Sequence, residues 1–162
     1  MTTINSERLL ADLHELRSFG AHGNGVIRTS FSDVDMASRN WLRERMSEAG
    51  LDASIDGVGN VIGRSPNDGP ALLLGSHSDT QPSGGWLDGA LGVIYGLEVA
   101  RALAEDEATR HLAVDAVAWI DEESSYCSCL GSRSYCGQMS MEELGAYTNG
   151  DGESVTQAIA RV

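Results

Sequence analysis

A histidine and two carboxylates lie close together in the chain after one short apolar run. Residues 71–74 are apolar and end at Gly75, which predicts a strand that is buried on both faces of a sheet. His77 and Asp79 follow at once, and a glycine-rich turn then leads to Asp88 at the start of a long helical pattern. In open α/β sheets, ligands bind beyond the carboxyl ends of the strands, so these side chains stand where chemistry is usually done.

Consecutive carboxylates end the next apolar run. Residues 112–120 are followed by Asp121, Glu122 and Glu123. A histidine combined with two carboxylates suits Zn²⁺ or Mn²⁺. Of two adjacent glutamates, one can bind a metal while the other stays free to take a proton from water, which is the general-base arrangement that hydrolysis needs. We therefore expect the two strand ends to form a metal site with a hydrolytic purpose.

Two of these carboxylates have more specific candidate roles. Asp79 can reach the second ring nitrogen of His77 if the backbone turns, and would then orient the ring. Asp88 could bridge two metal ions about 3.5–4 Å apart. Each residue also has a purely structural alternative: His77 as a core histidine, Asp88 as the N-cap of the helix, and Glu122 and Glu123 as loop charge. The combination at the ends of two successive strands favours the metal site.

Alternating strand and helix patterns position these residues. After residue 50 they predict one α/β domain with a mixed, largely parallel sheet flanked by helices. On the second helix, Arg39 and Arg43 are expected to face water. Capping boxes at 140–143 and 154–157 predict the starts of two short helices. The predicted helices are residues 6–18, 33–49 and 88–105, and the predicted strands are residues 51–55, 61–64, 71–74 and 112–120.

The composition excludes several classes of function. The formal net charge of −13 at pH 7 argues against nucleic acid and against anionic membrane surfaces as partners. All 11 basic residues are arginine, which excludes a Schiff-base lysine and the usual anchor for pyridoxal phosphate. The sequence contains no Gly-x-Ser-x-Gly elbow, no Walker loop and no Gly-x-Gly-x-x-Gly motif after a strand.

The cysteines and the start of the chain bear on location. Cys127, Cys129 and Cys136 form an odd set without a Cys-x-x-Cys pattern, which favours a reducing cytoplasm over a disulfide scaffold and leaves their role open. No apolar segment is long enough to span a bilayer, and the polar first residues do not form a signal peptide. We expect a cytoplasmic protein.

Several of these motifs together resemble one known group. The sequence is similar to the zinc-dependent amidohydrolases of the hydantoinase/carbamoylase group, which includes N-carbamoyl-L-amino-acid hydrolases and allantoate amidohydrolases. These enzymes are related to aminoacylases and dinuclear zinc exopeptidases. The resemblance covers nearly the whole chain and is carried by residues 49–51, 58–64, 75–80, 84–93, 97–100, 121–123 and 130–133.

The resemblance implies a role for each candidate residue. His77 resembles a ligand of one metal, Glu123 a ligand of the second, and Asp88 the carboxylate that bridges both. Glu122 resembles the general base, and Asp79 the partner that orients His77. The implied cofactors are two divalent ions, Zn²⁺ or Mn²⁺, per complete site. The implied reaction is hydrolysis of an N-carbamoyl amino acid or ureido acid, in which water attacks the carbamoyl or amide carbonyl.

Members of this group are more than twice as long as 162 residues. Their catalytic domain is interrupted by a lid domain that dimerises and binds the substrate carboxylate. The resemblance therefore implies that residues 1–162 are the N-terminal part of the catalytic domain, without the lid and with about half of the site. We expect weak metal binding and little turnover from this chain alone, unless a complementing chain supplies the rest.

Two local departures and two alternatives accompany this expectation. The group usually has Gly-Ser-Arg-Phe where residues 124–127 read Ser-Ser-Tyr-Cys, and a basic-aromatic pair where this chain has Trp86 and Leu87. Both changes adjoin the expected metals and could alter the choice of substrate. The alternatives to an amidohydrolase are a non-catalytic binding or regulatory module and an inactive truncated relic of such an enzyme.

Overall fold

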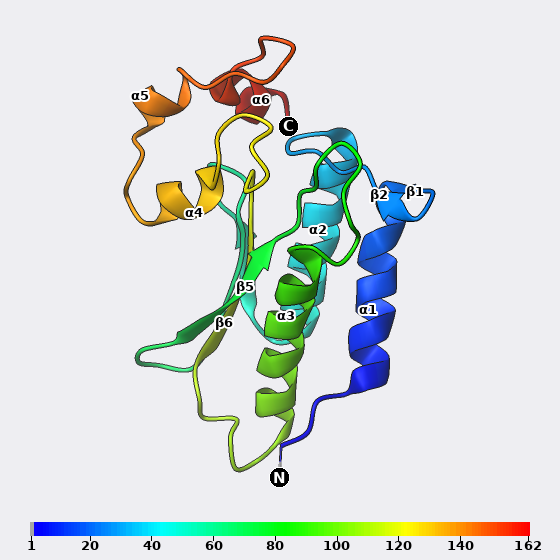
Figure 1. Cartoon of the computed structure of the whole chain (residues 1–162). Helices are drawn as coiled ribbons and strands as arrows, with labels where there is room; N and C mark the ends of the chain where they lie inside the picture. Colours follow the sequence, from blue (N-terminus) through cyan, green and yellow to red (C-terminus); the bar gives the residue numbers. More distant parts are fainter. Residues whose placement is uncertain (1) are drawn as a thin grey trace.

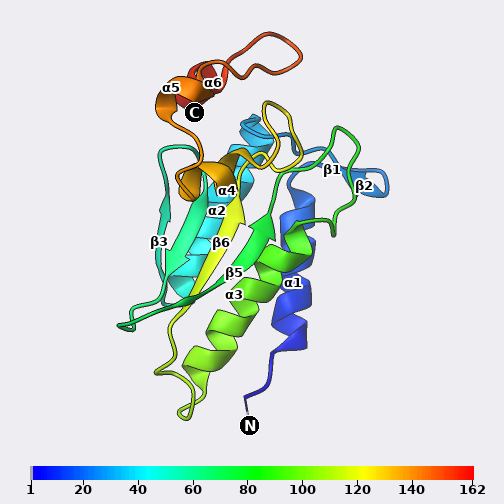
Figure 2. The same ribbon diagram turned by 60° about the vertical axis from the view of Figure 1, so that its left-hand side comes forward.

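The computed structural model describes residues 2–162, and these form a sheet that is covered by helices on one face (Figures 1 and 2). The helix α2 contacts β3 and β4, the helix α3 contacts β5 and β6, and α1 packs against α3. The helices are α1 (Ser6–Ser18), α2 (Asp33–Glu48), α3 (Ala90–Glu105), α4 (Leu130–Tyr135), α5 (Met141–Leu144) and α6 (Val155–Arg161). The strands are β1 (Ala21–His22), β2 (Gly25–Val26), β3 (Asp52–Ile55), β4 (Val61–Arg64), β5 (Leu72–His77) and β6 (Val114–Trp119).

The main sheet has the strand order β3-β4-β6-β5. β3 and β4 are antiparallel because only residues 56–60 connect them, and a connection this short reverses the chain. β4 and β6 are also antiparallel, whereas β5 and β6 are parallel. The mixed α/β sheet flanked by helices is confirmed. Parallel pairing among the described strands is confined to β5 and β6, which is less than the expected largely parallel sheet.

Side-chain caps begin the helices where the sequence predicts. Asn5 and Ser32 accept hydrogen bonds from backbone N–H groups in the first turns of α1 and α2. Both predicted capping boxes, at Ser140 and Ser154, are present. The two-stranded β1–β2 hairpin and α4 are additions to the predicted elements.

Two hydrophobic clusters hold these elements together. The larger cluster joins α1, α2 and α3 to the sheet through fully buried side chains such as Leu16, Leu42 and Leu97. The second cluster contains Phe31, Ile120 and other residues of the loop after β6 and of α4 to α6. It lies beyond the carboxyl ends of β5 and β6 and supports the loops that leave them (Figure 1).

The prediction that residues 71–74 are buried on both faces was wrong. Leu72 is 60% exposed, and Leu73 and Leu74 are only half-buried. The reason is the position of β5, which is the last strand in the order and is covered on one face by α3. Among the described residues, its outer edge has no neighbouring strand.

No helix in residues 2–162 has the length and apolar character needed to cross a membrane.

Tyr126, which packs edge-on against Phe31 in the second cluster, is expected to lose its hydroxyl proton at a higher pH than an exposed tyrosine does. Burial, and then the hydrogen bond that its hydroxyl donates to Glu153 at 2.7 Å, raise the pKa of Tyr126 from 10.0 to about 12. The fold therefore favours the neutral phenol. This stabilisation is complete below pH 10 and is lost as the pH rises through about 12. A titration followed by near-ultraviolet absorbance should show one late tyrosine that Tyr126→Phe removes. A single transition of all tyrosines near pH 10 would contradict this prediction.

Candidate metal site

The parallel register of β5 and β6 brings the predicted site residues to one edge of the sheet. His77 is the last residue of β5 and pairs with Trp119, the last residue of β6. Glu123 lies in the loop after β6, and Asp88 lies just before α3. One ligand atom from each of His77, Asp88 and Glu123 lies within 4.8 Å of the other two. One imidazole nitrogen and two carboxylates, gathered this closely, fit a divalent cation.

Glu122 lies beside this cluster. Its Oε2 atom is 3.5 Å from Nε2 of His77, and Oδ1 of Asp88 is 3.8 Å from the same nitrogen. The side chain of Glu122 is half-exposed, so water can reach it. It has the position that a proton acceptor next to the cluster needs.

His77 is oriented by Asp79, but through the backbone. Nδ1 of His77 lies 3.0 Å from the carbonyl oxygen of Asp79, while the nearest carboxylate oxygen of Asp79 is 3.7 Å away. A proton on Nδ1 donated to that carbonyl leaves Nε2 as the lone-pair nitrogen facing Asp88 and Glu122. The expectation that the carboxylate itself would reach the ring differs from this geometry.

The carboxylate of Asp79 instead joins the two strand-end loops. It is fully buried and accepts hydrogen bonds from the backbone N–H groups of Glu122 at 3.4 Å and Glu123 at 3.2 Å. The guanidinium of Arg39 lies 3.9 Å from it. Asp79 therefore fixes the histidine with its carbonyl group and both glutamates with its side chain.

Arg39 was predicted to face water, and this was wrong. Its side chain is fully buried, and its Nε atom donates to Asp35 at 2.9 Å. Its terminal nitrogens donate to the carbonyl oxygens of Gly59, Ala118 and Trp119, which joins α2 to the ends of the strands. Burial raises the pKa of Asp35, opposed by the charge of Arg39. The Asp35 and Arg39 spacing of four residues was the signal that could have indicated the pair.

Asp121 stabilises the loop after β6, a role that the run of three carboxylates in the sequence does not indicate. It is fully buried, has a φ of +53°, and accepts hydrogen bonds from the N–H groups of Ser125, Tyr126 and Cys127. Burial raises the pKa of its carboxyl group despite these donors. Asp121 therefore stabilises the loop after β6, whereas the next two carboxylates, Glu122 and Glu123, lie at the metal site.

All three cysteines are free thiols. Sγ of Cys129 lies 3.8 Å from Oε1 of Glu122, and Nη1 of Arg133 lies 3.3 Å from Sγ of Cys127. Cys136 is exposed. The thiol of Cys129, two residues beyond the segment that departs from the expected family pattern, therefore lies against Glu122.

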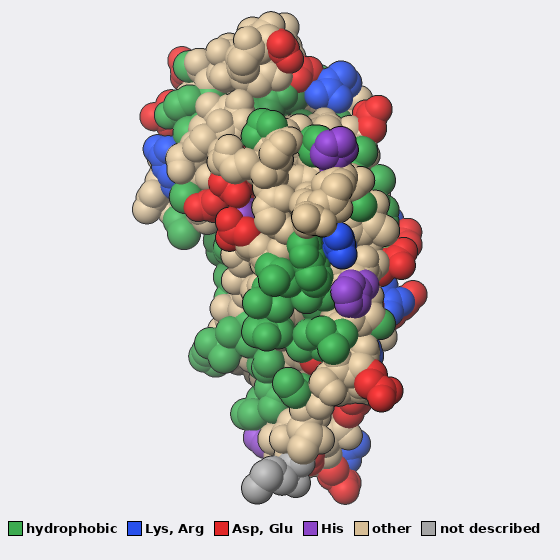
Figure 3. Space-filling model, turned by 45° about the vertical axis from the view of Figure 1, so that its right-hand side comes forward, with side chains coloured by type: hydrophobic (Ala, Val, Ile, Leu, Met, Phe, Trp, Pro, Cys, Tyr) green, Lys and Arg blue, Asp and Glu red, His purple; other side chains and the backbone are tan. Residues whose placement is uncertain are grey.

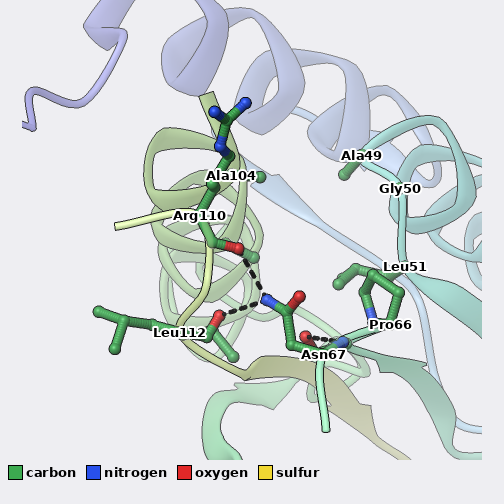
Figure 4. A pocket seen from close by; sticks show the side chains of 11 residues that line it. Ala49, Gly50, Leu51, Pro66, Asn67, Ala104, Arg110 and Leu112 are labelled. Atoms are coloured by element: carbon green, nitrogen blue, oxygen red, sulfur yellow. Dashed lines mark hydrogen bonds between the residues drawn. The ribbon is translucent and has the colours of Figure 1, made fainter. Parts of the chain in front are cut away.

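A pocket also lies away from the metal site. A cavity of about 210 Å³ opens at the amino-terminal ends of β5 and β6, at the opposite end of the sheet from His77 (Figure 4). Asn67 spans it and donates to the carbonyl oxygens of Arg110 and Leu112. No carboxylate or histidine lines this cavity, so it offers no ligands for a metal.

Comparison with known proteins gives first the class, since the similar proteins are named as hydrolases, and then the family. The sequence model of peptidase family M28 matches residues 60–159, and the chain therefore belongs to this family. The predicted resemblance to the hydantoinase/carbamoylase group is also confirmed, since named members of that group are similar over nearly the whole chain.

Three relatives illustrate the similarity. An N-carbamoyl-L-amino-acid amidohydrolase of Paenarthrobacter aurescens is 35% identical over 94% of this chain and 38% of its own length. A ureidoglycolate hydrolase of Arabidopsis thaliana is 31% identical over 95% of this chain and 34% of its own. The crystal structure of an amidase (hydantoinase/carbamoylase family) from Burkholderia phymatum superposes with a TM-score of 0.97 at 59% identity, over 99% of this chain and 40% of that one. The chain thus spans about 40% of the length of such relatives.

Proposed function

We propose that this chain is the N-terminal part of the catalytic domain of a metal-dependent amidohydrolase. The reaction is hydrolysis of a linear amide or carbamoyl C–N bond in an N-carbamoyl amino acid or a ureido acid. The observation that carries the proposal is the convergence of His77, Asp88 and Glu123, with ligand atoms within 4.8 Å of one another and Glu122 beside them. The names of the relatives support the substrate class.

The ligands of the metal site are His77, Asp88 and Glu123. In the proposed complete site, His77, Asp88 and Glu123 would be this chain's ligands for two divalent ions, Zn²⁺ or Mn²⁺. The residues of this chain fit such ions because they offer one imidazole and two carboxylates at one sheet edge. When bound, a divalent ion polarises a carbonyl oxygen and makes water more acidic.

Glu122 is the proposed general base. Its carboxylate accepts a proton from the attacking water and passes it to the leaving nitrogen as the C–N bond breaks. Asp79 holds His77 in the tautomer with Nε2 free and holds the backbone of both glutamates. For a carbamoyl substrate, water and the substrate yield ammonia, carbon dioxide and an amino acid.

The remaining parts of the site belong, in this proposal, to polypeptide corresponding to the other 60% or so of the relatives' length. That polypeptide supplies the further metal ligands, the groups that bind the substrate carboxylate and, in a lid domain, a dimer contact. It is covalently continuous with this chain or is a complementing chain. The small-molecule substrate, the free thiols and the net charge of −13 favour a cytoplasmic enzyme without nucleic-acid or membrane partners.

Metal titration tests the site. Zn²⁺ and Mn²⁺ added to the 162-residue chain in a calorimeter should bind weakly, and His77→Ala should remove this binding. Asp68→Ala changes an exposed carboxylate in a turn away from the site and should leave binding unchanged. Binding that survives His77→Ala would contradict the site.

Turnover tests the chemistry. The protein recovered from its own cells with whatever co-purifies should release ammonia from N-carbamoyl amino acids, and Glu122→Gln should lower the rate by about 10²–10⁴-fold while metal content is kept. Metal binding without any turnover would favour the non-catalytic binding module instead.

A further inference from the structure

Gln81, in the loop between β5 and α3, has a fixed backbone although its side chain is exposed. Its carbonyl oxygen accepts hydrogen bonds from the N–H of Gly84 at 3.1 Å and from the hydroxyl of Thr80 at 2.9 Å. Gly84 in turn pairs with Val26 of β2 through two backbone hydrogen bonds, at 3.0 and 3.1 Å. The loop is therefore held from both sides, and the Gln81 side chain starts from a defined position.

The amide of that side chain crosses to the loop after β6. Nε2 of Gln81 donates to the Oε2 atom of Glu123 at 2.6 Å and to the carbonyl oxygen of Glu123 at 3.0 Å. One NH₂ group carries two hydrogens, so both bonds can form together. Gln81 thus hydrogen-bonds to both the backbone and the side chain of Glu123.

Glu123 is held at three of its four polar atoms. Its N–H donates to Asp79, and its carbonyl oxygen and Oε2 accept from Gln81. Within residues 2–162, the other carboxylate oxygen, Oε1, has no hydrogen-bond partner. The donor is a neutral amide, which orients the carboxylate without cancelling the negative charge that a cation needs.

From this geometry we propose that Gln81 is a positioning residue of the metal site. It locks Glu123 in one rotamer, occupies Oε2 and leaves Oε1 for a divalent cation. A glutamate side chain that is ordered before the metal arrives gives up less conformational freedom on binding, so the affinity is higher. This inference rests on the proposed role of Glu123 as a ligand and adds the residue that prepares it.

The test is calorimetric titration of Zn²⁺ into the wild-type chain, Gln81→Leu and Gln138→Leu. Leucine is close in size to glutamine and has neither a donor nor a metal-binding atom. Gln138 is also exposed, and its side chain makes no hydrogen bond to any of residues 2–162. Gln81→Leu should weaken Zn²⁺ binding about tenfold, the range seen when groups behind a metal ligand are removed. Gln138→Leu should bind as the wild type does. The melting temperature in a chelator should be the same for all three proteins, because Gln81 acts on the ligand rather than on the fold.

A double-mutant cycle separates this inference from the proposed function. In a Glu123→Gln background, Gln81→Leu should cause no further loss of Zn²⁺ affinity. If the wild-type chain binds Zn²⁺ and Gln81→Leu binds it equally well, Gln81 has no positioning role and the proposed site stands. If Gln81→Leu and Gln138→Leu weaken binding equally, the positioning role is also overturned. If the wild-type chain binds no Zn²⁺ at all, the proposed site fails and this inference fails with it.

Discussion

Replacing Gly89 with alanine is expected to weaken Zn²⁺ binding about 100-fold, at the upper end of the effects of changes behind metal ligands. Gly89 is the N-cap of α3, with a φ of +65°, and its backbone lies against His77. A Cβ atom there would lie 2.5 Å from Nε2, Cε1 and the carbonyl oxygen of His77. Non-bonded atoms cannot approach this closely. Because the His77 ring is buried and hydrogen-bonded to Asp79, the added methyl group must displace Nε2 of His77 from the metal site.

The same substitution should lower the free energy of unfolding by about 1–3 kcal/mol, because it combines overpacking with a positive φ at a residue that has a side chain. Gly85 supplies the matched control in the same loop. A Cβ atom at Gly85 meets no atom within 4 Å, and its φ is not positive. Gly85→Ala should therefore change neither property. Wild-type Zn²⁺ affinity in Gly89→Ala, measured by calorimetry, would show that Nε2 of His77 does not bind the metal.

Replacing Asp79 with alanine is expected to lower the free energy of unfolding by about 3 kcal/mol, as is usual when one member of a buried charged network is removed. Two half-buried N–H groups, those of Glu122 and Glu123, would lose their acceptor. Arg39 would remain buried with Asp35 as its one carboxylate partner in the described chain. The loop that carries both glutamates would lose the hydrogen bonds to Asp79 and keep those from Gln81, so metal affinity should fall as well.

Urea denaturation measures the first effect, with the m-value checking that the same surface unfolds. Asp79→Asn keeps the shape and one acceptor oxygen, and it should lose less stability than Asp79→Ala. Asp151→Ala removes an exposed carboxylate from a turn near the C-terminal helices and should change stability by less than about 0.5 kcal/mol. A loss below about 1 kcal/mol in Asp79→Ala would mean that the buried carboxylate contributes little, which runs against its contacts.

The sequence indicates most of the architecture because its strongest signals are local. The first helix occupies Ser6–Ser18 and the second strand Val61–Arg64, as the apolar spacing and the turns predict. The long helix and the last strand begin two residues later than predicted, at Ala90 and Val114, because the ends of elements depend on contacts that periodicity does not encode.

The candidate site was predictable in outline for a related reason. Residues that directly follow adjacent parallel strands must meet at one sheet edge, and this places His77 near Glu122 and Glu123 whatever the details of packing. Which atom contacts which was not predictable. The contact of His77 with the carbonyl of Asp79 depends on how the backbone turns after β5. The burial of Arg39 and the hydrogen bonds from Gln81 to Glu123 depend on how segments distant in sequence pack together.

The outer edge of β5, which has no neighbouring strand within residues 2–162, bears on how copies of this chain would behave toward one another. Hydrophobic side chains form a broad stripe on one face of the molecule (Figure 3). The exposed apolar residues of the chain include Leu72, Leu87 and Tyr95. A free strand edge beside apolar surface attracts other chains, whereas a net charge of −13 repels them. Dissolved ions screen that repulsion beyond about 8 Å at physiological ionic strength and leave apolar contact intact. We therefore expect added salt to increase self-association of the 162-residue chain.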